Sequence, residues 1–494
     1  MQSSYARLHT VILLLALLSG VQGFNGFIPP SYAFHNSNLF VSAENTFSNN
    51  IFSGPMVIEV VIVDPAISSL DEPLGEPSVT VNGNKIRMLQ ATDGNWYAYF
   101  ADVDMAKVAD ATQPGIENGV DFSLRPGKGL NFGKFCNAAS GAGVLGFSTM
   151  DTKGFAIPSN ATTAPSGNSG TDGTTTFVTC SGGGSSAFTQ SAQKEMNVVR
   201  ENRTLTHSTT DVLAGQLGIR DANYWPFIQL YDFTPTGTAI VKYTKAGSTQ
   251  NTTLTFDSMI GINLSLDSSL YLQGSPVHVT LTDFQLNIDP TDEDSWTWGS
   301  NIRDNVFNKT VFYQLFNQTG LRDADGTAFD ITINQITRNV GALGAQNIFG
   351  NLTTLMFVDN GMLTFNNNTM NALVDVVRLS DNNDVSMFQD PKVGIGGLRT
   401  NTIAHNNLPI TLTETAPNSG IFTSTDENNN SILVIQDLAE TGTTASISYN
   451  STERIITVGT IDDQKKSCDA LDKASESGNG KKKGLEKAKE NNNC

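Results

Sequence analysis

Charged side chains are scarce in this chain of 494 residues, where they make up 16% of the total, against roughly 25% in an average soluble protein. The 48 acidic residues outnumber the 30 Lys and Arg, which gives a net charge of −18. Nucleic acids and anionic membranes bind through Lys and Arg that displace counterions, so neither is expected as a partner. The hydrophobic content of 39% is still enough for packed cores, which excludes global disorder.

Catalytic signatures are also missing from the sequence. It contains no GxSxG, HExxH, Walker or Rossmann pattern. After the first 23 residues the histidines are scattered and none has metal-ligand spacing; they are His35, His207, His278 and His405. Because catalytic groups can meet in space without a linear motif, an extracellular hydrolase stays open as the least favoured class. We expect a protein that is not an enzyme.

Long apolar runs are absent apart from one short run near the start. Residues 1–23 combine Arg7, an apolar run over residues 11–18 and small residues near Gly23, which is the pattern of a secretory signal peptide. The run is too short to span a bilayer, although an uncleaved N-terminal anchor is the alternative. No later segment has eighteen apolar residues, so we expect a secreted, extracellular protein without a transmembrane segment after the signal peptide.

Four cysteines are the entire thiol content. Cys136 and Cys180 flank a Gly/Ser/Thr-rich stretch, and Cys468 and Cys494 flank the C-terminal tail. In an exported protein, pairing of nearest neighbours is the simplest of the three possible arrangements, and it predicts disulfides Cys136–Cys180 and Cys468–Cys494. The alternative, a metal site or a reactive thiol, has no nearby Cys or His to support it.

Short strands separated by turn signals dominate the rest of the chain. Residues 56–63 form a nearly continuous apolar run typical of a buried strand, whereas residues 252–256 and 262–266 alternate apolar and polar side chains. The dipeptides Asn82-Gly83 and Asp93-Gly94 favour tight hairpin turns. The alternation after residue 277 slips at Thr282-Asp283, which predicts a bulge or bend there. The pattern indicates an all-β protein of antiparallel β-sandwiches with long loops.

Changes in composition suggest the domain boundaries. We expect an N-terminal β-rich domain over residues 24–235 with a Gly/Ser/Thr-rich loop at 158–186, and a β-sandwich region over residues 236–461. The second region has room for two sandwiches, divided between about residues 300 and 400. Residues 462–494 are rich in Lys and compatible with a short helical tail.

N-glycosylation sequons are the densest motif, and all of them follow residue 159. In a chain rich in Asn, Ser and Thr, about half would arise by chance. The candidates are Asn160, Asn202, Asn251, Asn263, Asn308, Asn317, Asn351, Asn367, Asn429 and Asn450.

Carboxylates gather after the strand that ends near residue 282. Asp283, Asp289, Asp292 and Asp294 lie within twelve residues, and loop carboxylates together with backbone carbonyls are the oxygen ligands that Ca²⁺ prefers. The spacing is not that of an EF-hand. A Ca²⁺ site and a solvated acidic turn are equally compatible with the pattern.

Several segments together resemble the surface-layer (S-layer) proteins of ammonia-oxidising archaea. They are NLFVSAEN (38–45), GPMVIEVVIVD (54–64), GNWYAYFAD (94–102), YWPFIQLYDF (224–233), VHVTLTDFQLNIDPTDEDSW (277–296) and TLTETAPNSGIF (411–422). The last one looks like the closing strand pair of an Ig-like domain common in archaeal surface proteins. The resemblance covers roughly residues 30–461. It implies tandem Ig-like domains, self-assembly into a two-dimensional sheet, dependence on Ca²⁺ and N-linked glycans.

Two departures qualify the resemblance: the chain is much shorter than typical members of that family, and its Lys-rich, Cys-bounded tail is unfamiliar there. The expected function is a secreted structural protein of the cell envelope. It would be a subunit or accessory component of an S-layer, with a second copy or a longer S-layer protein as partner. A secreted adhesin or ligand-binding β-sandwich protein is the alternative.

Overall fold

The computed structural model of the chain describes residues 38–43, 50–72, 74–110, 116–117, 120–121, 130, 132–158, 177–181, 198–199, 203–206, 214–233, 237–256, 262–300, 309–314, 363–366, 376–379, 410–425, 431 and 433–460. The chain divides into two units, Met1–Ser37 and Asn38–Cys494, and the described residues all belong to the second. The expected signal peptide, the Lys-rich tail and most of the 158–186 loop lie outside them.

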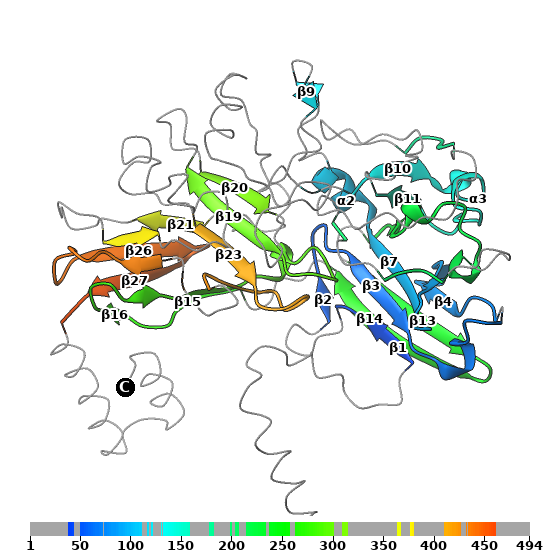
Figure 1. Ribbon diagram of the computed structural model, residues 1–494, viewed down its shortest axis with the longest axis horizontal. Coiled ribbons are helices and arrows are strands. Elements are labelled where there is room, and N and C mark those ends of the chain that lie inside the picture. Colours follow the sequence, from blue (N-terminus) through cyan, green and yellow to red (C-terminus); the bar gives the residue numbers. More distant parts are fainter. Residues whose placement is uncertain are drawn as a thin grey trace, which may run out of the picture. The chain divides into compact units, whose positions relative to one another are not determined.

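Within the described residues, the strands form sheets of seven, five, six, four, three and two strands (Figure 1). The seven-stranded sheet contains β1 (Leu39–Val41), β3 (Ile58–Ile62), β7 (Trp96–Asp102), β12 (Ile228–Tyr231), β11 (Gly154–Ile157) and β10 (Lys134–Asn137) in that order, with β6 (Leu89–Gln90) beside β7. The five-stranded sheet has the order β2 (Ile51–Phe52), β14 (Ser248–Phe256), β13 (Thr238–Lys245), β4 (Ser78–Val81) and β5 (Asn84–Lys85).

The remaining sheets come mainly from the second half of the chain. The six-stranded sheet has the order β15 (Asn263–Leu266), β18 (Val279–Thr282), β24 (Ile421–Thr423), β23 (Ile410–Glu414), β19 (Ser295–Ser300) and β20 (Lys309–Gln314). The four-stranded sheet has β16 (Leu270–Tyr271), β27 (Thr452–Val458), β26 (Thr444–Tyr449) and β21 (Leu363–Asn366). The smaller sheets are β17 (Pro276–Val277), β25 (Leu433–Ile435) and β22 (Val377–Leu379), and the pair β8 (Ile116–Glu117) and β9 (Val120–Asp121).

Helical segments are short in the described part of the chain. They are η1 (Pro65–Ile67), α2 (Val103–Asp110), η2 (Ala138–Ser140), α3 (Gly141–Val144), η3 (Ala214–Gln216), η4 (Ala222–Tyr224) and η5 (Phe284–Leu286). Among the described residues, none of these helices has the length and apolar character needed to cross a bilayer.

The first sandwich packs the seven-stranded sheet against the five-stranded one. Strand β7 is the centre of this packing, since all seven of its residues are buried. Trp96 and Phe100 point into the core shared with the five-stranded sheet, while Tyr97 and Tyr99 point into the core on the opposite face. Burial on both faces explains why the sequence of β7 shows no alternation of apolar and polar residues.

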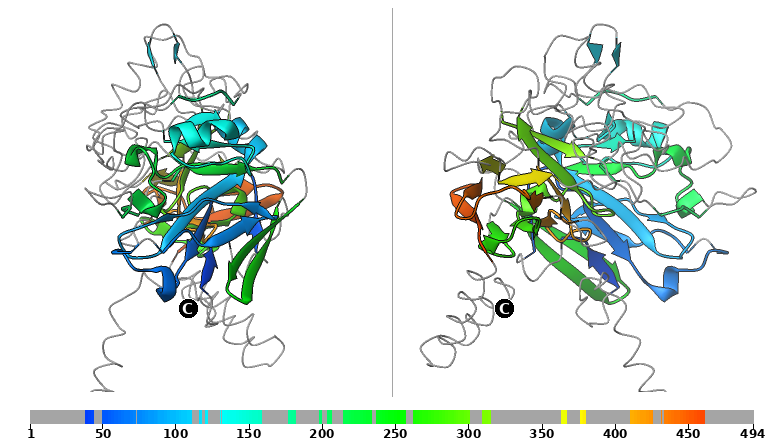
Figure 2. Two further views of the ribbon diagram at one scale, coloured as in Figure 1. Left: turned by 90° about the vertical axis from the view of Figure 1, so that its right-hand side faces the viewer. Right: turned by 60° about the vertical axis from the view of Figure 1, so that its left-hand side comes forward.

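The long hairpin of β13 and β14, green in Figures 1 and 2, completes the first sandwich. β13 pairs with β4, and β14 pairs with β2. The first sandwich therefore extends to residue 256, beyond the boundary expected at residue 235.

The core on the far face of β7 continues into the second β region. This core takes buried side chains from the six-, four- and three-stranded sheets, including Leu281, Tyr449 and Ile435. A backbone hydrogen bond of 2.9 Å from Val57 N to Ile288 O joins the start of β3 to the segment after η5.

The all-β expectation is confirmed, and several local predictions are confirmed with it. The apolar run at 56–63 contains β3, and the tight turn at Asn82-Gly83 joins β4 to β5 with positive φ angles of 51° and 83°. The slip at Thr282-Asp283 is a bend, because β18 ends at Thr282 and Asp283 caps the 3-10 turn η5. The sheets are not purely antiparallel, since β12 pairs with β7, β2 with β14 and β16 with β27 in parallel.

Candidate functional site

The acidic segment after β18 begins with a buried capping residue. Asp283 Oδ1 accepts a hydrogen bond of 3.0 Å from Gln285 N, which caps η5, and Oδ2 accepts one of 2.7 Å from the Tyr449 hydroxyl. Burial raises the pKa of Asp283, while the hydrogen bonds from Tyr449 and Gln285 act in the opposite direction. Asp283 thus ties the turn at the end of β18 to β26.

Asp289 and Asp294 hold the following turn together, and both are fully buried. Asp289 Oδ1 accepts hydrogen bonds from Thr291 N at 2.9 Å and Thr291 Oγ1 at 2.6 Å. The Asp294 carboxylate accepts from Ile288 N and, at 3.1 Å, from Asp289 N. Asp292 is only half-buried, and its Oδ1 accepts from Glu293 N at 3.0 Å.

These contacts bear on the expected Ca²⁺ ligands. Each of the four aspartates accepts a hydrogen bond from a backbone amide of its own segment. Among the described residues, no three His, Cys, Asp or Glu side chains converge into a group that could hold a metal ion. The carboxylates serve the backbone of the turn in this arrangement, and Ca²⁺ binding stays a prediction.

Glu414, which the sequence analysis did not single out, contacts the acidic segment from a distant strand. It lies on β23 with only 4% of its surface exposed. Its Oε1 accepts from Gly420 N at 2.7 Å, and its Oε2 accepts from Asp294 N at 3.3 Å. Burial, reinforced by the negative charge of Asp294, raises the pKa of Glu414 well above its ordinary value. Glu414 and Asp294 are thus two neighbouring buried carboxyl groups, and Glu414 favours the protonated form.

A further acid, largely buried, lies on β3, away from the acidic segment. Glu59 is opposite Tyr99 in the register between β3 and β7, and the Tyr99 hydroxyl donates a hydrogen bond of 2.9 Å to Glu59 Oε1. Burial raises the pKa of Glu59 from 4.5 to about 7; Tyr99 and Arg203 oppose the rise, and Asp93 adds to it. The Tyr99 ring packs against Trp225, with centroids 5.3 Å apart. The sequence analysis did not name Glu59, although a carboxylate inside the apolar run 56–63 was a signal that could have found this site.

Another buried acid, Asp64, is neutralised by a cation. Asp64, which caps η1, is 2% exposed. Lys245 Nζ lies 2.6 Å from Asp64 Oδ2, and the Tyr243 hydroxyl donates to the same oxygen at 2.7 Å. Although burial works against it, these bonds and that from Ala66 N hold the pKa of Asp64 below its ordinary value. The group connects the end of β13 to the turn after β3.

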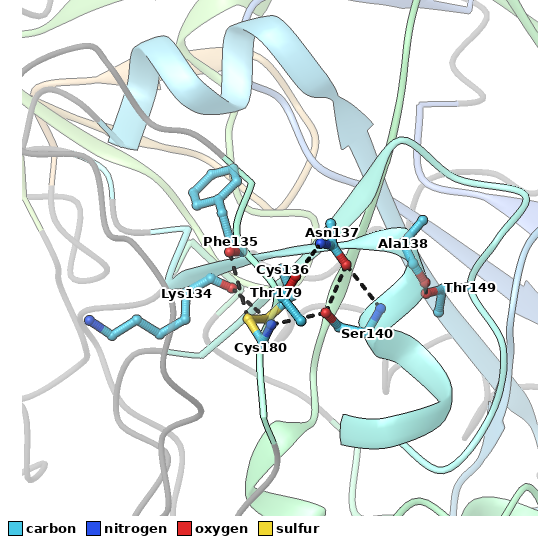
Figure 3. Close-up of a disulfide and its surroundings, with 9 residues drawn as sticks. All are labelled: Lys134, Phe135, Cys136, Asn137, Ala138, Ser140, Thr149, Thr179 and Cys180. Atoms are coloured by element: carbon cyan, nitrogen blue, oxygen red, sulfur yellow. Dashed lines mark hydrogen bonds between the residues drawn. A yellow bond between two sulfur atoms is a disulfide. The ribbon is translucent and has the colours of Figure 1, made fainter.

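The predicted disulfide Cys136–Cys180 is present, with an S–S distance of 2.05 Å and a Cα–Cα distance of 5.4 Å (Figure 3). Hydrogen bonds surround it: Asn137 Oδ1 accepts from Ser140 N at 3.0 Å, and Ser140 Oγ accepts from Cys180 N at 2.9 Å. Asn137 Nδ2 donates to Thr179 Oγ1 at 3.0 Å. The bridge attaches one end of the Gly/Ser/Thr-rich loop to β10. The predicted Cys468–Cys494 pair lies outside the described residues.

Three sequon asparagines fall within the described residues. Asn251 on β14, Asn263 on β15 and Asn450 in the turn between β26 and β27 are all exposed, as an acceptor site requires. The other candidates lie outside; they are Asn160, Asn202, Asn308, Asn317, Asn351, Asn367 and Asn429.

In comparisons with protein-family models and with curated proteins, no match to this chain was found.

Proposed function

We propose that this chain is a secreted structural protein of the cell envelope that acts as a subunit or accessory component of a self-assembling S-layer. Support comes from its β-sandwich architecture, from the resemblance of its sequence segments to archaeal S-layer proteins, and from the use of its buried polar groups. A sheet of subunits needs rigid modules that make the same contacts repeatedly.

The observation that carries the proposal is that buried acids connect distant segments of the chain. Asp64, Asp283 and Glu414 each join chain segments that are distant in sequence, through Lys245, Tyr449 and the amide of Asp294 respectively. Satisfied buried polar groups of this kind favour one well-defined arrangement of strands. That is the property which a repeating structural module requires.

An extracellular location is supported by the Cys136–Cys180 disulfide, because structural disulfides persist in oxidising compartments. The exposed positions of Asn251, Asn263 and Asn450 are compatible with N-linked glycans. We further propose that the acidic segment binds Ca²⁺ with a dissociation constant of about 10⁻⁴–10⁻³ M, as is usual for extracellular modules.

The test is negative-stain electron microscopy of the purified mature protein, with and without millimolar Ca²⁺ and with and without a longer S-layer protein. Ordered two-dimensional arrays, or decoration of an existing array, are expected. A soluble monomer that binds a small ligand saturably, and neither assembles nor joins an array, would instead favour a secreted adhesin or ligand-binding protein.

The Ca²⁺ proposal has its own test, in which Asp289 and Asp292 are both replaced by Asn. The double variant should have a lower melting temperature than the wild type only when Ca²⁺ is present. An equal decrease with and without Ca²⁺ would show that the two acids stabilise the turn without a metal ion.

A further inference from the structure

The outward face of the β13–β14 hairpin, with the neighbouring strand β4, has an unusual composition. Ile240 and Lys242 point outward from β13, and Ile240 is 40% exposed. Across the hairpin they lie opposite Thr253 and Asn251. The remaining outward positions of β4, β13 and β14 are Thr or Ser. We call this surface the β13 face.

The β13 face carries no carboxylate on these three strands, in a chain with 48 acidic and 30 basic residues. Its exposed cation is Lys242, which lies between Thr80 and Asn251 of the adjacent strands. An acidic surface can therefore approach it without repulsion.

The outward face of β26 and β27 has the opposite charge. Glu453 and Ile455 point outward from β27, and Ile455 is 55% exposed. Their partners on β26 are Ser448 and Ser446. Arg454 alternates to the other side of the sheet, where it lies opposite Ile447. We call this surface the β27 face; its outward positions are otherwise Ser or Thr.

The two faces match in spacing as well as in charge. On each strand the isoleucine and the charged residue are two positions apart, which places them about 7 Å from each other. If β13 and β27 of different copies run antiparallel, Ile240 lies on Ile455 while Lys242 lies on Glu453. The isoleucines bury apolar surface, and the charges fix the register.

Resting on the proposed structural function, we propose that the β13 face of one copy packs against the β27 face of the next copy, with Ile240 on Ile455 and Lys242 on Glu453. The contact is heterologous, so a pair of copies keeps one unused face of each kind and the contact can repeat along a row. Pairing of like faces would place each charge either against its own copy or against an isoleucine, and both arrangements are unfavourable.

One sequon is directly affected by this contact. Asn251 is adjacent to Lys242 on the β13 face, and an attached glycan would be too bulky to remain between two packed sheets, which lie about 10 Å apart. The proposal therefore requires Asn251 to be unmodified in assembled protein, whereas Asn450, in the turn at the end of β26, is free of this restriction.

The test uses charge reversal in the full mature chain, with association followed by sedimentation velocity over a range of concentrations. Lys242→Glu and Glu453→Lys should each weaken association about tenfold, because an attractive contact becomes repulsive. A mixture of the two variants should associate again, since the β13 face of the first, now acidic, meets the β27 face of the second, now basic. The variant that carries both reversals should associate by itself.

Matched controls are Lys153→Glu and Glu72→Lys, which change the net charge equally at exposed positions outside both faces. They should leave association unchanged, and all variants should keep the wild-type melting temperature of the monomer. Charge reversal that weakens association without rescue in the mixture would show that Lys242 and Glu453 do not face each other, and it would overturn the inference.

The remaining outcomes separate this inference from the proposed function. Wild-type arrays that tolerate both reversals, or assembled protein that carries a glycan on Asn251, would overturn the contact and leave the structural function standing. A wild-type chain that decorates arrays of a longer S-layer protein without associating with itself would likewise overturn only the contact. A chain that neither associates nor joins an array would overturn both.

Discussion

Replacing Glu59 by Gln should change how the stability of the protein depends on pH. The raised pKa of Glu59, about 7 against 4.5 for an ordinary glutamate, means that folding favours the protonated carboxyl group. Between these two values the native state holds more protons than the unfolded state, so the free energy of unfolding falls as the pH rises. Above about pH 7 both states are ionised and the full penalty of the buried charge is present.

The size of the penalty follows from the shift itself. A pKa change from 4.5 to about 7 corresponds to about 3 kcal/mol at most, using 1.36 kcal/mol per pKa unit. Gln keeps an oxygen that can accept the hydrogen bond from the Tyr99 hydroxyl but carries no charge. Glu59→Gln should therefore match the wild type near pH 4.5 and exceed its stability by about 1–3 kcal/mol at pH 8.

Urea unfolding followed by tryptophan fluorescence between pH 4.5 and 8 measures this difference, since Trp96 and Trp225 are both buried. The control is Glu72→Gln, because Glu72 is exposed and its replacement should give a similar small difference at every pH. If the difference between Glu59→Gln and wild type does not vary with pH, or if it decreases as the pH rises, the buried-charge explanation is refuted.

Three other changes test the described contacts. Replacing Cys136 and Cys180 together by Ala should lower the free energy of unfolding by about 4 kcal/mol, as expected for opening a loop of this length; urea titration measures it, and non-reduced peptide mapping should recover the linked pair from wild type. Tyr449→Phe removes the hydrogen bond to Asp283 and should lower stability by about 1–3 kcal/mol in urea titration, whereas an unchanged midpoint would contradict that role. Lys245→Met removes the cation beside a buried carboxylate and should destabilise by about 1–2 kcal/mol at pH 7, a modest value because Lys245 is itself 42% exposed. Since the pKa of Asp64 is lowered in the folded state, the loss should shrink as the pH falls below about 4 and vanish once the pH lies below that lowered pKa; a loss that does not shrink on acidification would exclude an electrostatic origin.

The sequence predicted those features that depend on neighbours along the chain. The tight turn at Asn82-Gly83, strand β3 and the change of direction at Thr282-Asp283 follow from local conformational preferences and side-chain alternation. The disulfide Cys136–Cys180 was predictable because few cysteines leave few pairings. Each of these depends on a short stretch of sequence or on simple counting.

Features that depend on distant segments were not predictable in this way. The alternation in a strand shows which side chains point inward, but it does not identify the neighbouring strand, so the parallel pairing of β7 with β12 has no local signal. Glu414 was missed for the same reason: its role depends on the amides of Asp294 and Gly420, which only the fold brings close. For Asp289 and Asp294, the sequence showed acidity but not that backbone amides occupy their oxygens.

Strand β7 is buried on both faces in the folded protein, but its neighbour β12 is synthesised long after it. β7 is aligned with β12 such that Phe100 lies opposite Gln229, and β2 is aligned with β14 such that Ile51 lies opposite Thr255. At about 5–20 residues per second, roughly 6 to 40 seconds separate the emergence of these partners from the ribosome. Throughout that interval β7, whose seven residues are all buried in the folded protein, has an unpaired edge. Pairings so distant in sequence slow folding, and a chain truncated before residue 228 would keep that edge permanently available to other chains.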